Sequence, residues 1–222
     1  MGKLYVFGCS YSSLYEMKLL NDPSINEYYK FRGGNFPKTW SEILSEDLDL
    51  ELVNMSEWGF DNYSIFENMC KVADKITAND VVIIGWTQVI RFRLFSERFN
   101  QFRSINVWDI TKNQELIDVS KDTIQEIIIN RDNERWVKEV YNWMNVINRL
   151  SKLVKFKLIY WSFFPDFAEL YIMNDLFKLG AETITQETNN VISNWHFGER
   201  GHEIQAKYFM EIVENKRKLK LI

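Results

Sequence analysis

The stretch of sequence that decides the fold is residues 4–12, Leu-Tyr-Val-Phe-Gly-Cys-Ser-Tyr-Ser. Its apolar first half predicts a buried strand, which ends at Gly8 and is followed at once by the hydroxyl of Ser10. Ligands of open α/β sheets bind at the edge where the carboxyl ends of the strands lie. The stretch therefore predicts a parallel sheet with Ser10 as a candidate nucleophile at its carboxyl edge.

Segments typical of strands and helices alternate along the rest of the chain. Strands are expected over residues 4–9, 50–55, 81–86 and 156–164, with a short one at 182–185. Helices are expected over residues 40–48, 61–76, 136–150, 167–179 and 201–215, and residues 11–36 are expected to form a loop. This alternation predicts an α/β fold, a three-layer α/β/α sandwich with a mostly parallel, flavodoxin-like sheet. A single domain over residues 1–222 accounts for it.

Residues 90–132 interrupt the alternation as a helical or irregular insertion. The aromatic residues of residues 91–103 fall at helical spacing with arginines between them: Phe92, Phe95, Phe99 and Phe102. This spacing favours a core or lid helix that packs one apolar stripe on the sheet. A contact surface at residues 91–108, for a second copy or a larger assembly, is the alternative. A nucleic-acid role is disfavoured because the net charge is -4.

The composition excludes several classes of site. The two cysteines, Cys9 and Cys70, fit neither a disulfide framework nor a zinc site, and two histidines cannot form a multi-histidine metal centre. We expect no metal and no cofactor. The first residues enter a strand without a basic and apolar leader, and no apolar run reaches about 18 residues. The expectation is a cytoplasmic protein with no membrane or nucleic-acid partner, and a place in a larger particle stays open.

Both histidines of the chain lie within residues 193–206. A serine hydroxyl needs a base to become a nucleophile. His196 is expected in the loop before the last helix, at the same sheet edge as Ser10. His202 is expected in the first turn of that helix, a position that indicates a structural role. Cys9 is a weak alternative nucleophile, because strand alternation points its side chain away from the face of Ser10.

Four segments, in this order, resemble the sequence blocks of the SGNH (GDSL-type) hydrolase family. They are Gly-Cys-Ser at 8–10, Asn-Met-Ser-Glu-Trp-Gly at 54–59, Gly-Trp-Thr-Gln at 85–88, and His196 followed by Gly-His at 201–202. The Phe-Gly-Cys-Ser-Tyr sequence is most similar to a "GCS" branch of that superfamily. The resemblance implies an SGNH-hydrolase fold over nearly the whole chain, with residues 90–132 as the unmatched part.

The resemblance also implies an oxyanion hole. Its donors would be the backbone amides of Ser10 and Gly59, together with the side chain of Thr87 or Gln88. The family has an asparagine at this last place. Thr87 matches its position, and Gln88 matches its amide chemistry. Gly59 as an ordinary turn glycine is the structural alternative.

The third member of a catalytic triad is replaced by uncharged residues. The family has an aspartate three residues before the histidine, where this chain has Ser193, and Asn194 lies two residues before His196. A neutral partner on Nδ1 can still fix the imidazole tautomer, but it stabilises the imidazolium less well. The sequence therefore supports a Ser10–His196 dyad better than a triad. A strand-end serine and a hydrogen-bonding loop histidine are the structural alternatives.

These residues predict a serine esterase or acyl hydrolase that acts on a small ester. The resemblance implies an O-acetyl group on a carbohydrate as the substrate class. Two alternatives stay open: a catalytically impaired binding or structural protein with the same fold, and an O-acyltransferase that uses the same dyad.

Overall fold

The computed structural model describes residues 2–96, 100–106, 122, 126, 130 and 133–214. Its central sheet has the strand order β2-β1-β3-β6, and every pair in it is parallel. The strands are β1 (Lys3–Phe7), β2 (Glu51–Asn54), β3 (Val81–Trp86) and β6 (Lys157–Ser162). The α/β class and the four main strands are confirmed.

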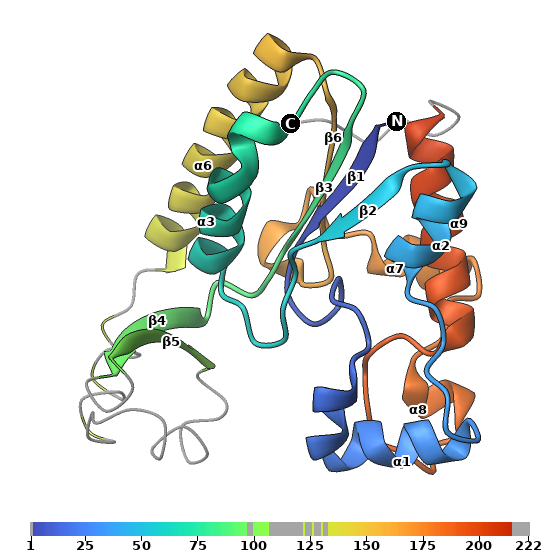
Figure 1. Ribbon diagram of the computed structural model, residues 1–222. Helices are drawn as coiled ribbons and strands as arrows, with labels where there is room; N and C mark the ends of the chain where they lie inside the picture. The colour runs from blue at the N-terminus through green and yellow to red at the C-terminus, as the bar shows by residue number, and fades with distance from the viewer. Residues whose placement is uncertain are drawn as a thin grey trace.

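Helices cover both faces of this sheet, so the predicted three-layer sandwich is confirmed (Figure 1). One face carries α2 (Trp40–Asp47), α7 (Met173–Lys178) and α9 (Glu199–Val213), and the other carries α3 (Asn62–Val72) and α6 (Asn133–Val154). Alternate residues of β1 serve the two layers: Leu4 and Val6 pack toward the first set and Tyr5 and Phe7 toward the second. Such two-sided burial explains why the strands are almost wholly apolar.

Two of the helix starts expected from sequence are confirmed by their caps. Asp61 accepts a hydrogen bond from the backbone N–H of Ser64 at 2.8 Å and begins α3. Glu42 accepts from the backbone N–H of Thr39 at 2.7 Å and completes a capping box that begins α2.

The expectation of a loop at residues 11–36 is wrong. This segment holds a 3-10 helix, η1 (Met17–Asn21), and an α-helix, α1 (Pro23–Phe31). Asp22 caps α1 by accepting from the backbone N–H groups of Ser24 and Ile25 at 2.9 and 3.1 Å. Ile25 and Tyr28, both fully buried, are its inward-facing residues. Two buried residues are too few to give a clear helical pattern in the sequence.

Two further expectations need correction near the end of the chain. The short strand at 182–185 is wrong, because Thr183 forms only an isolated bridge with Phe197, and α8 (Ile184–Glu187) begins at the next residue. The helix at 167–179 is shorter than expected. A 3-10 turn, η4 (Pro165–Phe167), comes first, and α7 starts only at Met173.

The helix expected over residues 91–103 is also wrong, because the segment forms an antiparallel hairpin of β4 (Arg91–Ser96) and β5 (Gln101–Asn106). Phe95 lies directly opposite Phe102, with ring centroids 5.3 Å apart. A spacing of seven residues matches two helical turns, but it equally matches a pair that faces across a tight hairpin. Asn100 supplies the turn with a positive φ of 47°.

Parts of the insertion lie outside the described residues, among them Arg98, Phe99 and most of 107–132. A single domain with one insertion, and an assembly surface at 91–108, therefore stay predictions. Within the described ranges, none of the helices has the length and apolar character needed to cross a membrane.

Candidate active site

Ser10 lies in a tight turn directly after β1. The backbone N–H groups of Ser12 and Ser13 donate to Cys9 O at 2.9 and 3.1 Å, and Ser13 Oγ donates to Ser10 O at 3.2 Å. A Cβ at Gly8 would lie 2.5 Å from Ser12 Oγ, so the turn requires glycine there. Ser10 is half-buried, whereas Cys9 is 3% exposed and packs in the core. The turn therefore presents the serine and hides the cysteine.

His196 lies in the loop before α9, and this loop is bonded to the start of α8. Ile184 N–H donates to His196 O at 2.8 Å, and Thr185 N–H donates to Asn194 O at 3.0 Å. The imidazole stacks on Tyr11, the residue after Ser10, with ring centroids 4.7 Å apart. Ser10 and His196 are thereby brought to the same edge of the sheet, as expected.

A second aromatic ring closes the other side of the imidazole. Trp58 stacks on His196 with ring centroids 4.3 Å apart and an interplanar angle of 24°. His196 is thus held between two aromatic faces, those of Tyr11 and Trp58. Sequence reasoning missed this contact, although Trp58 lies within the second of the four matched blocks.

Asn194 fixes the imidazole in its plane. Its Oδ1 lies 2.7 Å from His196 Nδ1 and accepts from the backbone N–H of the same histidine at 2.9 Å. The amide nitrogen of Asn194 donates to Ser24 Oγ at 2.7 Å, which leaves Oδ1 as the group that faces the ring. Ser193 is exposed. Of the two candidates for the orienting residue, Asn194 is the one in contact with the histidine.

This contact determines the tautomer of His196. Because Asn194 Oδ1 is an acceptor, Nδ1 carries the proton and Nε2 keeps its lone pair. Nε2 is buried and has no hydrogen-bond partner among the described residues, so Ser10 Oγ is not bonded to it in this conformation. Burial lowers the pKa of His196 to about 4, the charge of Arg91 adds to this, and Asp22 opposes it. The imidazole is neutral at pH 7.

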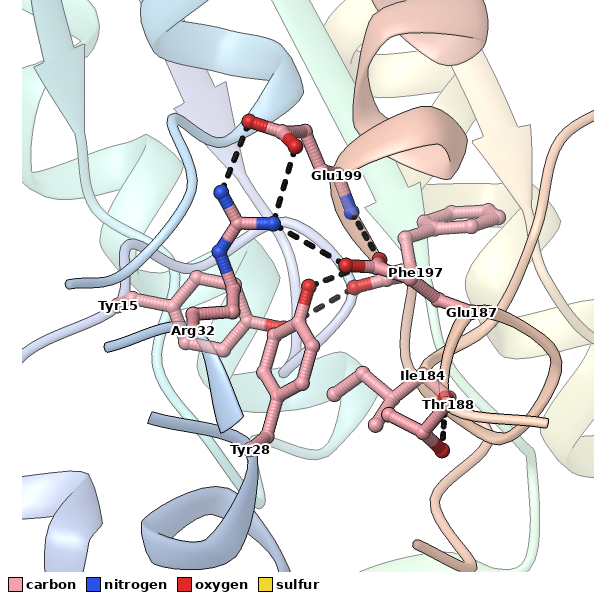
Figure 2. Close-up of polar contacts among 8 residues, drawn as sticks. All are labelled: Tyr15, Tyr28, Arg32, Ile184, Glu187, Thr188, Phe197 and Glu199. Atoms are coloured by element: carbon pink, nitrogen blue, oxygen red, sulfur yellow. Dashed lines mark hydrogen bonds and ion pairs between the residues drawn. The ribbon is translucent and has the colours of Figure 1, made fainter. Parts of the chain in front are cut away.

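A polar network ties α1 to the segment that carries His196 (Figure 2). Arg32 donates to Glu187 at 3.1 Å and to both carboxylate oxygens of Glu199, at 2.9 and 3.0 Å. Glu187 also accepts from the backbone N–H of Glu199 at 2.7 Å and from Tyr28 Oη at 2.9 Å. Burial opposes the charge of Arg32, but its carboxylate partners raise its pKa overall. The loop that carries His196 is therefore bonded to α8 through its backbone and to the end of α1 through Arg32.

The candidate oxyanion donors differ in how exposed they are and in whether their N–H groups already have an acceptor. Glu57 N–H donates to Gly8 O at 3.2 Å, so the turn that holds Gly59 begins beside the Ser10 turn. Gly59 is exposed and has a φ of +84°. Thr87 is fully buried, and its N–H donates to Asn62 Oδ1 at 2.8 Å. Gln88 is half-buried.

His202 has a structural place. Its Nδ1 accepts from the backbone N–H of Trp40 at 3.2 Å, which satisfies one free donor at the start of α2. Burial lowers the pKa of His202 to about 3. Among the described residues, no cluster of side chains suited to a metal ion is found.

Comparisons with known proteins give matches among solved structures at low sequence identity. No family model and no curated protein matches the chain. One similar solved structure is a member of the lipolytic protein G-D-S-L family from Veillonella parvula, 14% identical with a TM-score of 0.43, covering 96% of this chain and 99% of that one. Another is a lipase/acylhydrolase from Enterococcus faecalis, 14% identical with a TM-score of 0.38, covering 100% of both chains.

Proposed function

We propose that the protein is a serine hydrolase that cleaves a small ester. The observation that supports this best is the state of His196. Its Nδ1 is held by Asn194 at 2.7 Å, and its Nε2 is a buried acceptor at the sheet edge where Ser10 lies. A neutral imidazole with a free Nε2 is the form that a general base requires. Asparagine takes the orienting role in cysteine proteases of the papain type, so a neutral partner is compatible with catalysis.

In the proposed reaction, Ser10 Oγ attacks the ester carbonyl carbon while His196 Nε2 takes the hydroxyl proton. The Oγ–carbon bond forms, the ester C–O bond breaks, and the imidazolium returns the proton to the leaving alkoxide. Water then attacks the acyl-serine by the reverse proton route and releases the acid. An O-acetyl group on a carbohydrate is the substrate that the sequence resemblance favours.

The rings of Tyr11 and Trp58, which together form an aromatic sandwich around His196, would stabilise the imidazolium in addition to Asn194. A cation over the face of a tryptophan or tyrosine gains about 0.5–2 kcal/mol. Tyr11 and Trp58 both present their faces to His196. When the ring takes the proton of Ser10, these faces compensate in part for the missing aspartate.

Labelling with a fluorophosphonate probe tests the proposal. We expect covalent labelling at Ser10, located by peptide mass spectrometry, and its loss in Ser10→Ala and His196→Ala. Ser12→Ala is the matched control, because Ser12 lies in the same turn but is 1% exposed. Labelling that persists in Ser10→Ala would contradict the assignment of the nucleophile.

A specific observation favours one other function, a non-catalytic binding protein with the same fold. Ser10 Oγ and His196 Nε2 do not form a hydrogen bond in the structure. A folded wild-type protein that takes no label and hydrolyses no p-nitrophenyl acetate would support this second function. Transfer of the acyl group to an added alcohol in preference to water would indicate an acyltransferase instead.

A further inference from the structure

A pocket of about 360 Å³ lies beside the candidate active site, between α3, α6 and the β4–β5 hairpin. Figure 1 shows the hairpin next to the ends of these two helices. Its size falls within the range of small-molecule sites. Four aromatic residues, contributed by all three elements, line it: Tyr63, Phe102, Trp136 and Trp143. The hairpin belongs to the insertion that the sequence resemblance leaves unmatched.

The pocket adjoins the residues proposed for catalysis. Asn62, which lines it, binds both the N–H and the carbonyl of Thr87, at 2.8 and 2.9 Å. Arg91 also lines it, and its charge adds to the burial that lowers the pKa of His196. The same charge opposes the burial that raises the pKa of Tyr11. The backbone N–H of Arg91 donates to Gln88 O at 3.2 Å, which joins the pocket to a candidate oxyanion donor.

The two arginines of the pocket differ in whether their charge is paired with a carboxylate. Arg93 lies 3.8 Å from Asp61 and 3.4 Å from Glu67, and its guanidinium stacks on Tyr63 at 4.7 Å. Its charge is thus already matched. Among the residues that the structure describes, the Arg91 side chain makes a single long contact, 3.4 Å to Phe60 O, and its buried Nε has no partner. Arg91 also has no carboxylate partner among the described residues, so an anionic group on a ligand would match its charge.

We infer that this pocket binds the flat apolar part of the substrate and that Arg91 binds an anionic group on that part. The ligand class is an aromatic carboxylate or sulfonate, or an ester that carries one. This inference rests on the proposed function for its link to catalysis, but binding can be measured without turnover. Three carboxylates also line the pocket. Asp61 and Glu67 lie beside Arg93, whereas Glu139 opposes an anion there.

Two fluorescent probes that differ only in their charge test the inference. They are 1-anilinonaphthalene-8-sulfonate and its uncharged parent, N-phenyl-1-naphthylamine. We expect the folded protein to bind the sulfonate at least tenfold more tightly than the parent. Arg91→Met should abolish this preference while leaving the affinity for the parent within about twofold, since the apolar stem is kept. Glu139→Gln should strengthen sulfonate binding by removing a like charge.

Controls separate the pocket from other sites. Trp143→Ala should weaken both probes about tenfold, and Arg200→Gln, at an exposed arginine of α9, should change neither. Near-ultraviolet circular dichroism of each variant excludes binding to a loosened core. Equal affinities of the two probes for the wild type, no binding of either, or an unchanged preference in Arg91→Met would each overturn the inference.

Ser10→Ala keeps this test independent of catalysis. The variant should bind both probes as the wild type does, because the pocket does not include Ser10. A protein that fails fluorophosphonate labelling but shows the Arg91-dependent preference would lose the hydrolase proposal and keep the binding site. A protein that is labelled but lacks that preference would keep the hydrolase proposal and lose the binding site.

Discussion

Asn194 Oδ1 lies 2.7 Å from His196 Nδ1 and also accepts the backbone N–H of the same residue. One uncharged oxygen thus fixes the loop, the ring plane and the tautomer together. A carboxylate would add a charge to this geometry. Because the oxygen is neutral, it adds no charge to counter the burial of the ring, and the pKa of His196 falls to about 4.

We predict opposite effects from two substitutions of Asn194. Asn194→Ala removes the acceptor on Nδ1 and should lower kcat by about 10- to 100-fold, because the base loses its orientation. Asn194→Asp places a negatively charged carboxylate beside Nδ1 and should raise the pKa of His196. The acid limb of the kcat/KM profile, or the NMR titration of His196 if turnover is absent, should then move to higher pH.

Ser193→Ala is the control for both, since Ser193 is the exposed neighbour in the same loop. It should leave the titration unchanged. A titration that Asn194→Asp does not move would show that Asn194 is not coupled to the ring in solution.

The two histidines predict a loss of stability in weak acid. Burial lowers the pKa of His196 to about 4 and of His202 to about 3, whereas both titrate near 6.5 in the unfolded chain. Between these values the unfolded state binds more protons, so the free energy of unfolding falls as pH drops from about 6.5 toward 4. The loss should be on the order of 2 kcal/mol per histidine at pH 5.

Urea denaturation at pH 7 and pH 5 measures this loss. His202→Asn keeps an acceptor for the Trp40 N–H but cannot titrate, so its difference between the two pH values should be smaller than that of the wild type. An equal difference in both proteins would mean that His202 is not buried in its neutral form.

The layers of the fold could be predicted because their signals are local. Residues 81–86 are apolar without interruption, and Asp61 and Thr39 cap their helices through contacts within three residues. The hairpin could not be predicted, because the spacing of Phe95 and Phe102 is shared by a helix and by a pair across a turn. Helix α1 has a readable cap at Asp22 but only two buried residues.

The candidate site likewise has a part that the sequence predicts and a part that it does not. The order of the blocks predicted Ser10 and His196 as neighbours at one sheet edge. The choice between Ser193 and Asn194 depends on which side chain the loop turns inward, and that follows from bonds to α8 that no local pattern encodes. Stacking of Trp58 on His196 joins segments far apart in the chain and has no signature in sequence.

We predict that the network around Arg32 stabilises the histidine loop. Arg32→Met leaves the carboxylate of Glu187, 17% exposed, without its cation and should cost about 2 kcal/mol of unfolding free energy. Arg32→Lys should rescue little, because an ammonium cannot pair with two carboxylates in the same planar geometry. Arg200→Met is the matched control. Its pair with Glu203 is exposed, so the cost should stay within about 0.5 kcal/mol.

The last prediction concerns which residue supplies the side-chain donor to the oxyanion. The backbone N–H of Thr87 is already bonded to Asn62, and the Thr87 side chain is fully buried. Gln88 is half-buried and has the amide chemistry that the role requires. We therefore expect Gln88→Ala to lower kcat by about 100-fold with little change in KM, since removal of one oxyanion donor costs that much. Thr87→Val, which keeps size and backbone contacts, should change kcat by less than about fivefold. Steady-state kinetics on p-nitrophenyl acetate decide between the two residues, and the reverse ranking would assign the donor to Thr87.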